Sequence, residues 1–198
     1  MLTKSELTSK FIIETVAPIF NKKGYAATSM SDITNATNLT KGAIYGNFEN
    51  KEAIAIAAFH KNVNDLLLKV AKHQEQSKSP LQKLFLITDF YRNYYDFSRE
   101  LGGCPILNIG VDANHQDTIL IEHVRLVINK TQHNISKLID WGKETGEIKQ
   151  EVNSHLFSKR LYSHIQGAIF MTYTMDDDQY LKQSMIEMDS IIKNDIEN

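Results

Sequence analysis

The chain has 198 residues, 42% of them hydrophobic and 23% charged, with a formal net charge of −2 at pH 7. This length suffices for one domain or two with a sizeable core, and the sequence contains no low-complexity tract. The slightly negative net charge excludes a protein whose whole surface is basic and binds nucleic acid, so any contact with DNA has to be local.

Several protein classes are excluded by what the sequence lacks. No apolar run approaches the roughly 20 residues that span a bilayer, and no signal peptide opens the chain, so we expect a cytoplasmic protein without membrane contact. The single cysteine, Cys104, excludes an intrachain disulfide. The seven histidines show no metal-ligand spacing, and there is neither a glycine-rich phosphate loop nor strand-type alternation. We therefore expect an all-α protein with no metal, no cofactor and no catalytic site.

The first predicted helix starts with a capping box, Thr3 and Glu6, followed by an apolar stripe. Gly24 is expected to end it, and Pro18 inside it should produce a kink because proline lacks a backbone donor. The next stretch, 28–39, predicts a short helix that ends in a turn at Asn38.

Residues 40–48 predict a second short helix. Thr40 can cap it, while Ile44 and Phe48, four residues apart, can anchor it to a core. The outer face of this helix is polar and slightly positive, and it is narrow enough for a major groove. The residues of this outer face are Lys41, Ala43, Tyr45, Gly46 and Asn47.

This segment resembles the helix-turn-helix signature of TetR/AcrR-type transcriptional regulators. The matching residues are Thr28, Ser29, Ile33, Ala36, Leu39 to Phe48, Lys51 and Glu52. A dozen residue types match at fixed spacing, and the resemblance covers about a quarter of the chain, roughly Phe11 to Phe59. It implies an N-terminal three-helix helix-turn-helix domain, joined by a long helix to a helical ligand-binding and dimerisation domain.

The resemblance also implies roles for individual residues. Phosphate contacts are expected from Thr28, Thr40, Lys41, Tyr45 and Lys51. Ala43 is the candidate for a thymine methyl group and Asn47 for an adenine edge, while Gly42 lets the backbone approach the duplex. Gly46 departs from the family pattern, in which an aromatic or polar side chain is common. The predicted DNA-binding residues are Thr28, Thr40, Lys41, Gly42, Ala43, Tyr45, Gly46, Asn47 and Lys51.

After Asn50, which can cap it, a long apolar-striped helix is expected to reach the low 70s. Ser79 and Pro80 mark a strong new helix start, so we place domains at 1–50 and 79–198, with a connecting helix and linker at 51–78. A change in the tilt of the connecting helix would move the recognition helix.

The fifth predicted helix, Leu81 to about Arg99, carries aromatics on more than one face. Scattered polar groups among apolar walls are typical of a small-molecule pocket. The predicted pocket residues are Phe85, Thr88, Asp89, Tyr91, Arg92, Tyr95, Cys104, Asn108 and His123.

The rest of the chain predicts further helices. Pro105 suits a first helical position, and Asp117 is expected to cap a long helix that reaches about Lys143. In proteins that this chain resembles, helices near 118–144 and 154–174 pair across a two-fold axis.

Cys104 has two interpretations. Its predicted place at a helix N-terminus lowers a thiol pKa and would suit an electrophile or redox sensor. Alternatively, it is an inert buried cysteine that acts as a small hydrophobe, which is the interpretation we favour.

Together these features predict a homodimeric, ligand-responsive regulator, a repressor that an unidentified small-molecule inducer releases from a palindromic operator in double-stranded DNA. One alternative is a thiol-sensing regulator based on Cys104. Another is a helical small-molecule-binding protein or enzyme without operator binding, although no carboxylate pair or Cys/His dyad supports it.

Overall fold

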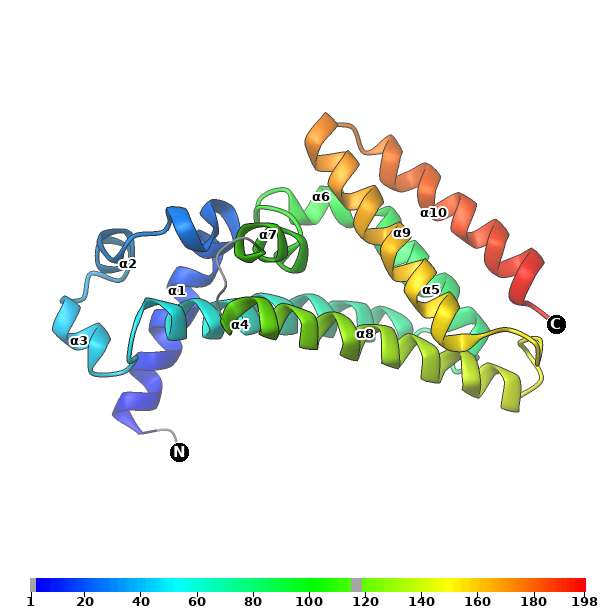
Figure 1. Cartoon of the computed structure of the whole chain (residues 1–198), viewed down its shortest axis with the longest axis horizontal. Coiled ribbons are helices and arrows are strands. Elements are labelled where there is room, and N and C mark those ends of the chain that lie inside the picture. The colour runs from blue at the N-terminus through cyan, green and yellow to red at the C-terminus, as the bar shows by residue number, and fades with distance from the viewer. Residues whose placement is uncertain (1–2, 115–118) are drawn as a thin grey trace. The chain divides into compact units, whose positions relative to one another are not determined.

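The computed structural model describes residues 3–114 and 119–198, and this part of the chain is all-helical, which confirms the predicted fold class (Figure 1). No helix in these two ranges is long and apolar enough to cross a bilayer. The helices are α1 (Lys4–Ala27), α2 (Met30–Thr37), α3 (Lys41–Tyr45), α4 (Lys51–Gln74), α5 (Pro80–Arg92), α6 (Tyr94–Ser98), α7 (Pro105–Ala113), α8 (Ile119–Glu144), α9 (Ser154–Met175) and α10 (Gln179–Ile191), with a π-helical turn η1 (Ile192–Ile196).

Side-chain caps set most of the helix starts. In each case an oxygen of the residue before the helix accepts a hydrogen bond from a backbone N–H in the first turn, which satisfies a donor that the helix itself cannot. These caps are Thr3, Ser29, Thr40, Asn50, Ser79 and Asn153. The predicted cap at Asp117 lies outside the described residues.

Two predicted helices differ in detail. The backbone of α1 leaves helical geometry at Gly24 (φ 80°, ψ 172°), the predicted end, but one more turn follows it to Ala27. The predicted fifth helix is divided at Asn93 (φ −103°, ψ 7°) into α5 and α6. The aromatic pattern continues across Asn93, so periodicity did not reveal the break.

The chain forms two compact units. The first unit comprises Met1–Leu66 and Glu100–Leu126, and the second comprises Leu67–Arg99 and Val127–Asn198. Each unit is assembled from two separate stretches, whereas the division that the sequence favours follows chain order. Consequently α4 and α8 are each continuous from one unit into the other.

The core of the first unit forms around α1, which contacts α2 and α7. Its fully buried side chains include Ile12, Val16 and Phe20 of α1, together with Ile33 and Ile44 from the two short helices. Burying side chains of this size contributes about 1.5–3 kcal/mol each, so the two short helices are held mainly by these anchors.

In the second unit α10 contacts both α5 and α9. Leu84, Leu161, Ile169, Leu181 and Met185 are completely buried between these three helices. The antiparallel pair α9 and α10 is visible in orange and red in Figure 1.

Candidate functional site

The turn between α2 and α3 fixes the start of α3. Asn38 closes α2 in the left-handed region (φ 55°, ψ 29°), a conformation that asparagine tolerates better than most residues. Thr40 then caps α3, with its Oγ1 accepting the Ala43 N–H at 3.2 Å. Both features lie where the sequence predicts them.

One side of α3 is buried and the other is open. Ile44 has no exposed surface, whereas Lys41, Gly42, Ala43, Tyr45 and Gly46 are all exposed. Tyr45 is 45% exposed, so its ring and hydroxyl are accessible to a partner surface. This arrangement agrees with the predicted outer face, and the DNA contacts themselves stay predictions.

Asn47 is the exception on that face, because its amide is already engaged. Its Oδ1 accepts hydrogen bonds from Ser5 Oγ at 2.9 Å and Ser9 Oγ at 3.2 Å, and its Nδ2 donates to the Ala43 carbonyl at 2.9 Å. The side chain therefore joins the end of α3 to α1. An adenine contact by Asn47, as expected from the resemblance, requires these bonds to be exchanged.

Lys51 and Thr28 also serve inside the first unit, in contrast to the phosphate contacts expected of them. Lys51 Nζ donates to the carbonyls of Tyr25 and Thr28, both at 2.9 Å, and lies 4.3 Å from the centre of the Tyr25 ring. Thr28 is fully buried, and its hydroxyl donates to the Gly24 carbonyl at 2.6 Å. Both side chains thus help to fix the end of α1, Lys51 by joining it to the start of α4. The sequence did not reveal this because the Lys51 partners are carbonyls, which leave no sequence signal.

Helix α7 belongs to the first unit and holds the same end of α1. Asp112 Oδ2 accepts hydrogen bonds from the N–H groups of Tyr25 at 2.5 Å and Ala26 at 3.1 Å. These donors start the short helical turn after Gly24, so Asp112 acts as its N-cap from another helix. Sequence reasoning missed Asp112 entirely.

A pair of asparagines adds to this attachment. Asn108 Nδ2 donates to the carbonyls of Asn21 at 3.0 Å and Gly102 at 2.6 Å. In return, Asn21 Nδ2 donates to the carbonyls of Leu101 at 2.6 Å and Gly103 at 3.1 Å. The Asn108 amide thus attaches α7 to α1, and its pocket role stays a prediction.

Cys104 precedes α7, as predicted, and it is not among the residues that line the cavity of the second unit described below. The side chain is 1% exposed and makes no capping hydrogen bond. Reactive thiols need solvent access, so this burial favours the inert interpretation over a sensor.

His123, also a predicted pocket residue, pairs with His60. The two ring nitrogens, His60 Nε2 and His123 Nδ1, lie 2.9 Å apart within the first unit. Partial burial, followed by the proximity of His123, lowers the pKa of His60 below its ordinary value. This pair connects α4 to α8 in a way that depends on protonation.

Three polar residues predicted for the pocket, Thr88, Asp89 and Arg92, instead form a network that joins α5 to α10 and α4. The Thr88 hydroxyl and the Arg92 guanidinium both donate to Asp189 on α10. Arg92 also pairs with Asp89 at 3.2 Å, and Asp89 accepts from His73 at 2.9 Å. These contacts hold α5 to α10 and to α4, while Arg92 Nε is buried without a hydrogen-bond partner.

Two further predicted pocket residues, Tyr95 and Phe85, are not among those that line the cavity described below. The Tyr95 hydroxyl donates to Asp176, a bond that raises the Tyr95 pKa. Phe85 is half-buried and does not line a described cavity.

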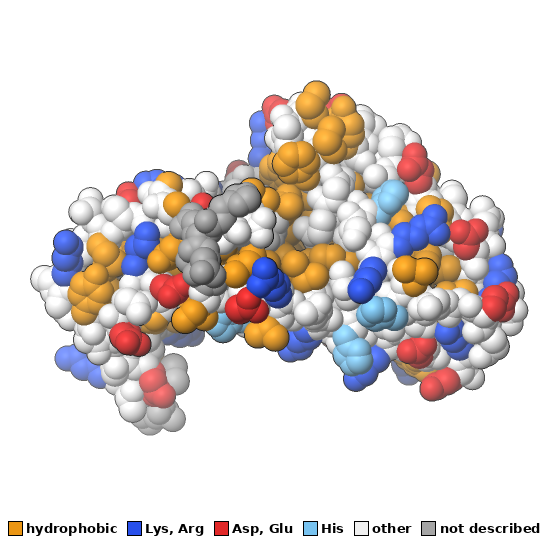
Figure 2. Space-filling model, in the orientation of Figure 1, with side chains coloured by type: hydrophobic (Ala, Val, Ile, Leu, Met, Phe, Trp, Pro, Cys, Tyr) orange, Lys and Arg blue, Asp and Glu red, His pale blue; other side chains and the backbone are white. Residues whose placement is uncertain are grey.

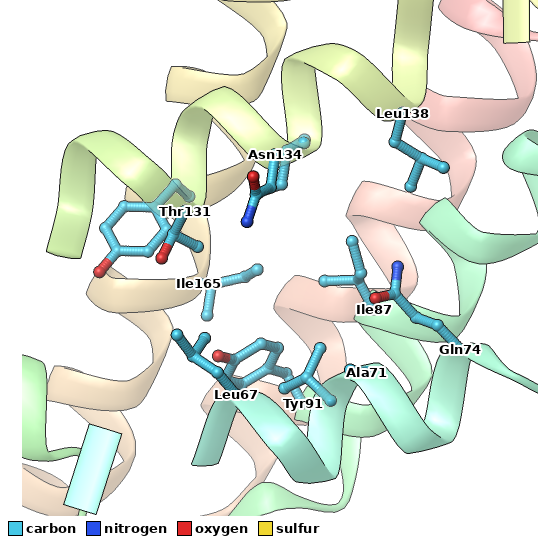
Figure 3. Close-up of a pocket in the computed structure, with 12 residues that line it drawn as sticks. Leu67, Ala71, Gln74, Ile87, Tyr91, Thr131, Asn134, Leu138 and Ile165 are labelled. Atoms are coloured by element: carbon cyan, nitrogen blue, oxygen red, sulfur yellow. The ribbon is translucent and has the colours of Figure 1, made fainter. Parts of the chain in front are cut away.

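The second unit contains a cavity of about 160 Å³, which borders a neighbouring face of α5 (Figure 3). Ile87 and Tyr91, four residues apart, form the α5 face that borders it, whereas Thr88 and Arg92, one position further round, face α10. Tyr91 is thus the one member of the predicted pocket set that lines this cavity. The complete lining is Leu67, Val70, Ala71, Gln74, Ile87, Tyr91, Thr131, Asn134, Ile135, Leu138, Tyr162 and Ile165.

The second unit also has an exposed apolar face on α9 and α10. Figure 2 shows hydrophobic side chains gathered where α9 ends and α10 begins. We define the α9–α10 face by its large exposed residues, which are Leu156, Phe170, Met171, Met175, Tyr180 and Ile186. Such a concentration of exposed apolar side chains typically marks an interaction site.

Two family models match the chain. The one described as "Bacterial regulatory proteins, tetR family" matches residues 12–58, and the one described as "Tetracyclin repressor-like, C-terminal domain" matches residues 80–188. The first match contains α3, and the second contains α5 and α9.

Individual proteins agree with this assignment. The HTH-type transcriptional repressor DhaR of Mycobacterium sp. (strain GP1) is 26% identical over 162 residues, which are 80% of this chain and 78% of DhaR. A TetR-family transcriptional regulator from Cytophaga hutchinsonii is 32% identical, with a TM-score of 0.91 over 98% of this chain and 96% of that one. A more distant fold match is FadR from Bacillus subtilis in complex with stearoyl-CoA, at 16% identity and a TM-score of 0.75 over 92% and 96% of the two chains.

Proposed function

The chain belongs to the TetR family of transcriptional regulators, and on this premise we propose that α3 is the DNA-recognition helix of an operator-binding repressor. The protein is a ligand-responsive, DNA-binding transcriptional regulator. The proposal concerns which residues perform these functions.

The observation that supports the DNA site is the exposed face of α3 on its buried anchor. Lys41 supplies a positive charge for a phosphate, and Ala43 is small enough to meet a thymine methyl group. Gly42 and Gly46 have no side chain, so the backbone of α3 around them can approach the duplex closely. The first 61 residues carry seven lysines against five acidic residues, so the local charge is positive although the whole chain is negative.

We further propose that the repressor is a homodimer assembled through the α9–α10 face, with α10 taking the place of the helix near 118–144 beside the helix near 154–174 that the resemblance suggests. Gly167 lies among the exposed residues of α9, and a Cβ atom there would meet nothing within 4 Å in this chain. A glycine destabilises a helix by about 1 kcal/mol relative to alanine. Close packing of a helix from a second protomer against Gly167 gives a reason for a glycine at this position. A two-fold axis at this face would present two copies of α3 to a palindromic operator.

Ligand control is proposed to act through α4. This helix is continuous from Lys51, which bonds the end of α1, to Leu67, Val70, Ala71 and Gln74, which line the cavity of the second unit. A ligand that favours one conformation of α4 shifts operator affinity, and the operator must shift ligand affinity by the same factor.

The test is selection of operator DNA from sheared genomic fragments by the purified full-length chain. We expect recovery of an inverted repeat whose half-sites are about one helical turn apart. Recovery of fragments with no shared sequence at moderate salt would refute an operator-specific repressor.

A further inference from the structure

The cavity of the second unit differs from a general ligand site in its lack of charge. Its walls are mainly aliphatic, from Leu67 and Val70 of α4 to Ile135 and Ile165 of α8 and α9. Among the described residues that line it, none is Asp, Glu, Lys, Arg or His. Burying an ionised group without a partner is strongly unfavourable, so this cavity selects against charged ligands.

The polar groups in the lining suit hydrogen bonding to a neutral molecule. Figure 3 shows the Asn134 amide directed toward the cavity from α8, next to the Thr131 side chain. The Thr131 hydroxyl donates to the Val127 carbonyl at 2.9 Å, so toward a ligand it acts as an acceptor. Gln74 Nε2 donates to the Lys83 carbonyl at 3.3 Å, which leaves its oxygen as a second acceptor.

The size of the cavity limits the ligand further. Its volume is about 160 Å³, close to the roughly 150 Å³ of an engineered protein cavity that holds one benzene molecule. Sites for drug-sized ligands usually measure about 300–1,000 Å³. A body of one six-membered ring therefore fills the space.

We propose that the inducer of this regulator is a compact, uncharged molecule with a ring-sized apolar body and one amide, carbonyl or hydroxyl group, which Asn134 and Thr131 bind. This inference rests on the proposed function, in which the cavity is the inducer site. It excludes ligands of the kind seen with FadR, because stearoyl-CoA carries a long acyl chain and phosphates, and phosphates are normally met by arginine or lysine.

Calorimetric titration of the full chain with benzamide and benzoate tests the charge requirement, because the two probes have nearly the same shape. Benzamide should bind in the millimolar range or tighter, and at least about tenfold more tightly than benzoate, because a carboxylate is far more costly to desolvate than an amide. Stearoyl-CoA should not bind in the cavity.

Two substitutions on α4 locate the binding. Ala71→Trp places a large ring at the exposed rim of the cavity and should abolish benzamide binding. Leu68→Trp is the matched control, because Leu68 is 68% exposed on the same helix and does not line the cavity.

Asn134→Leu should reduce the preference for benzamide over toluene without preventing the binding of toluene.

The outcomes separate this inference from the proposed function. Benzoate or stearoyl-CoA binding that Ala71→Trp blocks, or no binding of benzamide, overturns the inference even if the protein binds its operator normally. Benzamide binding that depends on Ala71, in a protein that selects no operator, supports the inferred ligand class while the proposed repressor function fails.

Discussion

The Asp112 carboxylate of α7 accepts a 2.5 Å hydrogen bond from the backbone N–H of Tyr25, where α1 resumes after Gly24. The two residues are 87 positions apart in the sequence, so α7 provides the cap for a helix that lies far from it along the chain. This contact holds α7 against α1, the helix to which Lys51 and Asn47 also form hydrogen bonds. Lys51 bonds this same end of α1, whereas Asn47 bonds its start through Ser5 and Ser9, so α1 as a whole connects α7 to the segment that follows α3.

Asp112→Ala should destabilise the first unit and weaken operator binding. Loss of a helix N-cap typically costs about 1 kcal/mol, within a range of about 0.5–2 kcal/mol. Chemical denaturation measures the stability, and fluorescence anisotropy measures operator affinity. Asp112→Asn retains an acceptor oxygen and should restore most of both. Equal loss in the two variants would mean that capping is not the role of Asp112.

Acid should weaken the first unit through His60 and His123. Because the folded-state pKa of His60 lies below its ordinary value of 6.5, the unfolded chain binds more protons as the pH falls below that value. The contribution of His60 to the free energy of unfolding is therefore fully present above pH 6.5. It is lost as the pH falls from there through the folded-state pKa. Urea denaturation between neutral pH and pH 5 measures the effect. His123→Asn, which can keep a hydrogen bond without titrating, should show a shallower decline, and parallel declines would exclude the pair as the cause.

Asn47 can be tested as a positioning residue for α3. If it acts by joining α3 to α1, Asn47→Ala and the double variant Ser5→Ala/Ser9→Ala should weaken binding to all operator variants alike. A base contact predicts a different pattern, with a loss of about 1–3 kcal/mol confined to one base position and confined to Asn47→Ala. Anisotropy titrations against single-base operator variants separate the two roles.

The α9–α10 face should determine the oligomeric state. Phe170 is 50% exposed, so Phe170→Arg leaves the core unchanged but places a charge within the proposed interface. Sedimentation analysis should show a monomer, and operator affinity should fall by about 100-fold or more because two linked contacts become one. Leu68→Arg, an equally drastic change at an exposed leucine on α4, should remain dimeric. A dimeric Phe170→Arg protein would place the interface elsewhere.

The sequence predicted those features that depend on neighbouring residues. Helix caps such as Thr3, Thr40 and Ser79 act within three positions of themselves, and the burial of Ile44 follows from its helical spacing. The TetR resemblance of residues around α3 then identified the family. Each of these signals is local, so one sequence was enough.

The pocket could not be predicted in the same way. On α5, Tyr91 and Arg92 are adjacent in sequence, yet one borders the cavity and the other pairs with Asp189, and the difference depends on where α8 and α10 pack. The attachment of Asn108 to α1 left no sequence signal because its partner there is a carbonyl, 87 residues away. Contacts of this kind follow from tertiary packing and carry no periodic signal in the sequence.

The central claim is that the outer face of α3 binds DNA, and titration of operator affinity against salt concentration tests it most directly. The wild type and Lys137→Ala, an exposed lysine on α8, should bind with the same salt slope, whereas Lys41→Ala should bind every operator variant more weakly with a slope smaller by about one. Tyr45→Ala should also weaken binding without changing base preference. If Lys41→Ala and Tyr45→Ala bind like the wild type, α3 does not contact DNA and the account is contradicted.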